Sequence, residues 1–121
     1  MRSNTPLQAL ASLNEVLFME AAQSLAKRAI ENGDDETERL TYAFRACLTR
    51  APESDELDEL RQLLARQKAY IGEGWINPSE LATGKSEVPK KLPGKVTPTE
   101  LAAYTVAARV LLNLDETISK E

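Results

Sequence analysis

The chain carries few side chains that could do catalysis. It has no histidine and a single cysteine, Cys47, among 121 residues. Histidine is the commonest general base and metal ligand, so triad chemistry and the usual zinc and haem sites lose their main component. Cys47 falls on an apolar face with Phe44 and Leu48, where a thiol acts as a small hydrophobe with no base to activate it. We therefore predict no catalytic residue, metal ligand or cofactor within the chain.

Two arginines and an acidic run are the next candidates. Arg45 and Arg50 could bind an anion, because guanidinium groups hold carboxylate and phosphate in a bidentate manner. The alternative is solvation, or an ion pair to Asp55 or Glu56. The carboxylates of residues 55–59 are explained by the start of a helix, which favours negative charge, and their spacing does not predict a metal site.

Polar residues at the two ends of the chain form a second candidate. Arg2 and Asn4 open the sequence, and Asn113, Asp115 and Glu116 interrupt the apolar pattern near its end. If the two ends meet at one end of a bundle, these side chains form a polar docking surface. A capped or solvated helix end explains them equally well.

Trp75 is the candidate recognition aromatic. It stands with Ile76 in residues 73–96, a stretch rich in proline and glycine that predicts a long irregular loop before the last helix. Anchoring against the helices is the competing interpretation, because an adjacent apolar pair favours packing on the core over exposure to water. We expect part of the loop to pack back, with a short turn at 78–82.

Composition limits the partners. The net charge is −4 and the pI about 5.0. Nucleic acid binding needs a concentrated basic face, and Lys90-Lys91 is only a short basic spot. No apolar run approaches the roughly 20 residues that span a bilayer. We therefore expect protein partners, no nucleic acid and no membrane insertion.

Helix signals divide the rest of the chain. Thr5 is a predicted N-cap, with a break at Asn14-Glu15, and Asn32-Gly33 ends the first stretch because glycine accepts left-handed geometry. The apolar stripe between them is predicted to begin again at Leu17. Further boundaries follow: a helix from Asp34-Asp35-Glu36 to Ala51-Pro52, one from a Ser54 cap to about Ile71, and one after the Thr97 cap.

These elements predict an all-α fold, a small four- to five-helix bundle with a long irregular loop before the last helix. Residues 1–121 fit a single domain. The chain reaches its first helix signal after only four residues, which predicts a fragment of a larger protein.

The chain resembles the C-terminal part of domain of unknown function 1553, a planctomycete-type domain found in multidomain proteins with cytochrome c-like modules. Four islands carry the resemblance: Asn4 to Leu10 with Leu13-Asn14; Phe44-Arg45 with Leu48, Arg50 and Pro52; Glu56-Leu57; and Ala102-Ala103-Tyr104 through Glu116. The chain departs from the pattern at Glu15-Val16, where such proteins commonly have Asp-Pro, and near Thr117, where they have an aromatic residue.

The resemblance implies a helical tail of a multidomain, exported or periplasmic bacterial protein, with no activity or cofactor to carry over. Two functions stay open. The first is a noncatalytic interaction or structural module that packs against upstream domains of the same polypeptide or another protein. The second is a contribution by Arg45, Arg50, Asp115 and Glu116 to an enzyme or ligand site completed by upstream domains.

Overall fold

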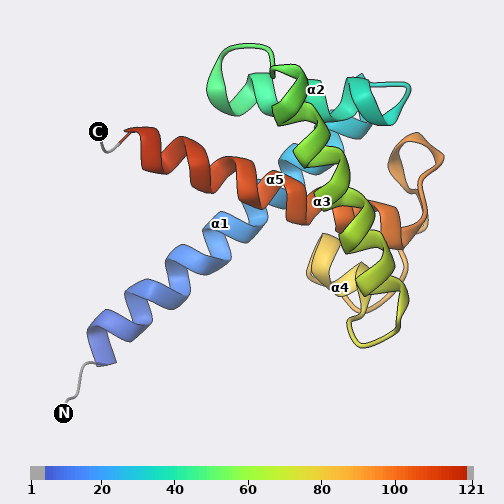
Figure 1. Cartoon of the computed structure of the whole chain (residues 1–121). Helices are drawn as coiled ribbons and strands as arrows, with labels where there is room; N and C mark the ends of the chain where they lie inside the picture. The colour runs from blue at the N-terminus through green and yellow to red at the C-terminus, as the bar shows by residue number, and fades with distance from the viewer. Residues whose placement is uncertain (1–4, 120–121) are drawn as a thin grey trace.

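The computed structural model describes the backbone of residues 5–119 and the side chains of residues 16–114. Within that range the secondary structure is entirely helical, which confirms the all-α prediction (Figure 1). There are five α-helices and one 3₁₀ turn: α1 Thr5–Asn32, α2 Glu36–Leu48, α3 Ser54–Gly72, α4 Pro78–Thr83, η1 Pro93–Lys95 and α5 Pro98–Ser119.

The last helix is the centre of the bundle. α5 contacts α1, α2, α3 and α4, and Figure 1 shows it crossing the middle of the molecule. Its apolar face is fully buried from Leu101 to Leu111. Alanines are prominent in it and in the buried part of α1, and short side chains allow two helices to pack at close range. Leu64 and Ile71 of α3 complete the core from the other side.

Local signals start the helices largely as predicted. Thr97 and Glu100 form a reciprocal capping box, in which each side chain accepts the backbone N–H of the other residue, at 3.1 and 3.0 Å. Asp35 caps α2 by accepting the N–H of Glu38 at 2.8 Å. The predicted turn at 78–82 is helix α4, capped by Asn77 through the N–H of Ser79.

Three predicted boundaries are wrong. α1 continues through Asn14-Glu15 without a break, since asparagine costs a helix only about 0.7 kcal/mol and no proline or glycine follows until Gly33. α2 ends at Leu48 instead of Ala51-Pro52, because Thr49 adopts left-handed geometry at φ 58°. α3 begins after an N-cap at Glu53, whose N–H donates to the Glu56 carboxylate, so Ser54 is already inside the helix.

Gly33 ends α1 as predicted, but for a different reason. Its φ is not positive, so the left-handed geometry expected of a glycine cap is absent. A Cβ on this residue would instead lie 2.7 Å from the backbone nitrogen of Arg39. The glycine is therefore required by the close approach of α2, which places the Arg39 Nε 3.0 Å from the carbonyl of Gly33.

Burial in α1 begins later than the sequence predicts. Of its described side chains, none before Ala22 is buried, and Val16 and Leu17 are 55% and 54% exposed. Figure 1 shows the first half of α1 extending away from the other helices. We call residues 5–21 the arm. Only the end of this segment approaches the other helices: the Phe18 ring lies 5.9 Å from the guanidinium carbon of Arg109 on α5, and Met19 lies beside Leu81 of α4.

Candidate functional site

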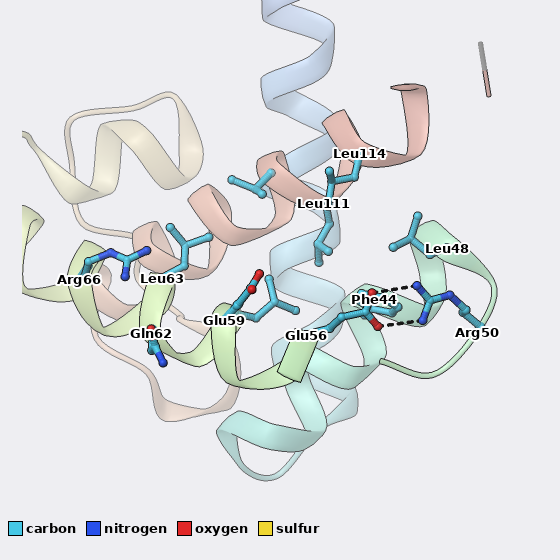
Figure 2. Close-up of a pocket in the computed structure, with 12 residues that line it drawn as sticks. Phe44, Leu48, Arg50, Glu56, Glu59, Gln62, Leu63, Arg66, Leu111 and Leu114 are labelled. Atoms are coloured by element: carbon cyan, nitrogen blue, oxygen red, sulfur yellow. Dashed lines mark hydrogen bonds and ion pairs between the residues drawn. The ribbon is translucent and has the colours of Figure 1, made fainter. Parts of the chain in front are cut away.

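An open groove lies where α2 ends, α3 begins and α5 leaves the bundle (Figure 2). Its volume is about 510 Å³, and twelve residues line it: Phe44, Leu48, Arg50, Glu56, Glu59, Leu60, Gln62, Leu63, Arg66, Val110, Leu111 and Leu114. Seven of these are apolar, which makes the floor hydrophobic, and the charged residues come from α3 and the turn before it. We call this site the α3–α5 groove.

Part of the groove wall that α5 provides is exposed to water. Val110 and Leu114 are four residues apart and so occupy one face of the helix. They are 38% and 45% exposed, whereas Leu111, next to Val110, is fully buried in the core. Figure 2 shows Leu111 and Leu114 on the side of α5 that faces the groove. The groove is therefore an extension of the core that the chain itself leaves uncovered.

The turn after α2 fixes the charged end of the groove. Left-handed geometry at Thr49 reverses the chain, so that Arg50 meets the start of α3. Its two terminal nitrogens donate to the two carboxylate oxygens of Glu56 at 2.8 and 2.9 Å, the bidentate arrangement drawn in Figure 2. The guanidinium also lies 5.0 Å from the centre of the Phe44 ring, a cation–π distance. Arg50 therefore makes its bidentate hydrogen bonds to Glu56, within the fold.

The Arg50 hydrogen bonds lower the pKa of Glu56 from 4.5 to about 2, and the N–H of Glu53 acts in the same direction. Because the folded pKa lies below the unfolded value, this contribution to stability is present above about pH 4.5 and is lost as the pH falls toward 2. We expect Glu56→Gln to flatten the acid decline of the melting temperature between pH 5 and 2, measured by circular dichroism. Glu59→Gln, on the same helix, is the control, and an identical decline in wild type and Glu56→Gln would contradict the assignment.

The predicted site residues do not gather in one place. Arg50 lines the groove, but Arg45 does not and is exposed on the last turn of α2. Asn113 is exposed on α5 beside Leu114. Arg2 and Asn4 lie outside the described residues, and so do the side chains of Asp115 and Glu116. The two-ended polar surface remains a prediction.

Trp75 does not anchor the loop. Its side chain is 80% exposed, the largest value among the exposed large hydrophobic residues described, and Ile76 is only half-buried. Ile71 before the turn and Ala82 after it are the residues that enter the core here. Trp75 borders a shallow hollow of about 410 Å³ together with Met19 and Leu81. Its role as a recognition aromatic stays a prediction.

Sequence reasoning missed the α3–α5 groove. Its residues come from three helices, and their spacing within each helix is the ordinary spacing of a core face. Val110 in particular follows the same pattern as the buried residues beside it. Nothing in the sequence distinguishes Val110, because its 38% exposure depends on how the helices pack.

Two negative findings apply to the described residues. No group of three or more acidic, cysteine or histidine side chains there could hold a metal ion. No described helix is long and apolar enough to cross a membrane.

Fold and groove together define a small helical domain with an open apolar surface. Residues 1–64 match PSD1, a protein family of unknown function (DUF1553), and the chain belongs to this family. The match covers α1, α2 and the first half of α3, so the resemblance seen at Ala102 to Glu116 falls outside it. Searches of curated proteins and of solved structures found no match.

Proposed function

We propose that this chain is a noncatalytic helical interaction module of a larger bacterial polypeptide, at whose C-terminal end it lies. Its α3–α5 groove takes up an apolar helix supplied from outside the bundle. One observation carries the proposal: three helices direct apolar side chains into a groove of about 510 Å³ that no segment of the described chain fills.

The physical reason is the surface that remains exposed. A helix whose apolar face continues past the core, as α5 does at Val110 and Leu114, loses stabilisation of about 25 cal/mol for each Å² left in water. Covering the groove recovers that free energy. Helix-in-groove docking is the mode in which apolar anchors at positions i and i+4 are buried by a second helix.

Thiol accessibility tests this proposal. Cys47 is buried, so Val110→Cys adds the only exposed thiol among the described residues. In the full-length polypeptide we expect Val110→Cys to react with a maleimide at least ~10-fold more slowly than Val88→Cys, as followed by peptide mass spectrometry. Val88 is the matched control, because it is a valine 64% exposed and does not line the groove.

Partial unfolding is controlled by the thermal melt of each variant, since only variants that melt like the wild type are compared. Equal labelling rates at positions 110 and 88 in the full-length polypeptide would show that the groove stays open and would refute the proposal.

A further inference from the structure

We propose that the helix lying in the α3–α5 groove is α3 of a second copy of this chain, so that two α3 helices pack antiparallel about a twofold axis. The inference rests on the proposed function and names the partner. Two charged residues that line the groove, Glu59 and Arg66, carry it together with the apolar surface beside them.

These two opposite charges are not neutralised within the described chain. Glu59 and Arg66 are both exposed, and neither forms an ion pair with any described residue. The positions three and four residues from Glu59 hold two carboxylates, an amide and a leucine, and those around Arg66 hold an amide, a leucine, an alanine and a tyrosine. No opposite charge is therefore adjacent on the helix, where an ion pair would form most readily. The groove offers one anion and one cation to a partner.

Both charges lie on the same edge of α3. They are seven residues apart, which is about two helical turns and about 10.5 Å along the axis. Residues at this spacing share a helix face, and Leu63 lies between them on that face. Figure 2 shows Glu59, Leu63 and Arg66 on the side of α3 that faces α5. Along the groove, α3 thus presents an acidic, an apolar and a basic residue in that order.

This order is complementary to its own reverse. A twofold axis between Gln62 and Leu63 makes a second α3 run antiparallel to the first and places Glu59 of each copy opposite Arg66 of the other. Two identical ion pairs result. A parallel pair in the same register would instead bring like charges together, which disfavours that contact. The charge pattern of the groove therefore fits a second copy and fixes its direction.

Apolar burial supplies the affinity of the contact. Leu63 is half-buried, and Val110 and Leu114 are 38% and 45% exposed. The antiparallel arrangement covers these residues of both copies at once, because α3 of each copy lies in the groove of the other and the contact closes at two copies. Solvent-exposed ion pairs contribute little by themselves, so the charges act mainly by selecting the partner and its direction.

The test is the oligomeric state of the isolated chain by light scattering after size exclusion, from about 1 to 200 µM, because dimer formation depends on concentration. We expect about twice 13.4 kDa for the wild type at the upper concentrations. Glu59→Arg places arginines opposite each other, and Arg66→Glu places glutamates opposite each other, so each should raise the dimer Kd at least ~10-fold. Glu87→Arg, in the exposed loop and outside the groove, is the matched control and should leave the Kd near the wild-type value.

Exchanging the two charges separates this arrangement from other dimers. The double variant Glu59→Arg with Arg66→Glu is again complementary to itself and should dimerise like the wild type. A mixture of the two single variants pairs two arginines with two glutamates, so heterodimers should form at concentrations where each variant alone is monomeric. Thermal melts followed by circular dichroism restrict the comparison to variants that fold like the wild type.

Three results would overturn the inference: a wild type that is monomeric at 200 µM, charge reversals that act no more strongly than Glu87→Arg, or loss of rescue in either the double variant or the mixture. If Val110→Cys is nevertheless protected in the full-length polypeptide, another segment occupies the groove, and the proposed function survives without the dimer.

Discussion

Residues 1–64 alone, the segment that matches the family, are expected not to fold. This fragment keeps α1, α2 and half of α3 but loses α5, which supplies the buried stretch from Leu101 to Leu111. Without α5 the buried faces of α1 and α3 lose their principal partner. We expect weak helical circular dichroism and no cooperative thermal transition. The net free energy of unfolding of a protein is only about 5–15 kcal/mol, and the stabilisation lost with the buried face of α5 exceeds it.

Two further fragments sharpen the experiment. A chain of residues 16–121 lacks much of the arm but keeps every described buried residue, so it should melt cooperatively like the whole chain. Addition of a separate 65–121 fragment to 1–64 should restore helicity, since it returns α5. Cooperative melting of 1–64 by itself would mean that the family segment is an autonomous domain, contrary to the core described above.

Among glycine-to-alanine substitutions in the loop, Gly94→Ala is expected to be the most destabilising. Gly94 has φ +56°, where side chains are strained, and a Cβ there would lie 2.6 Å from Cγ2 of the fully buried Ile30. Strain of about 1–3 kcal/mol and overpacking of similar size act together, so we expect a loss of roughly 2–4 kcal/mol in the free energy of unfolding. Urea denaturation followed by circular dichroism measures it.

Gly84→Ala is the matched control. Gly84 also has positive φ, at +82°, but a Cβ there meets nothing within 4 Å. The control therefore shows the strain without the collision, and the difference between the two variants isolates the contact of the loop with Ile30. If both variants lose the same stability, η1 does not press on α1 as the structure places it.

Both glycine arguments concern how the loop of residues 73–96 is held. The sequence marks it as irregular, yet it contains α4 and η1, and Ser79, Ala82 and Val96 are buried. A further tie comes from Gln23 of α1, whose amide donates to the carbonyl of Leu81 at 2.9 Å. Long connections without regular structure are uncommon in compact domains, and this one is packed through short elements.

The sequence by itself determined the helical class and most helix starts. Thr97 with Glu100 and Asp35 act within three or four residues of themselves, so their capping role can be predicted without knowing the fold. The spacing of Leu40, Phe44, Leu60 and Leu64 likewise identified core positions, because an apolar face of period 3.6 must be buried somewhere. The family was also visible in the sequence.

Only the tertiary structure decided which apolar residues stay in water. Leu17 and Leu25 fit one predicted stripe, but Leu25 is 2% exposed and Leu17 is 54% exposed. The difference is that Leu25 belongs to the core cluster, whereas Leu17 lies in the half of α1 that extends away from the other helices. The period of the apolar residues shows which face of a helix is apolar. Whether that face is covered depends on where helices distant in the sequence end. For this reason the α3–α5 groove, the exposed arm and the exposure of Trp75 emerged only once the helices were packed.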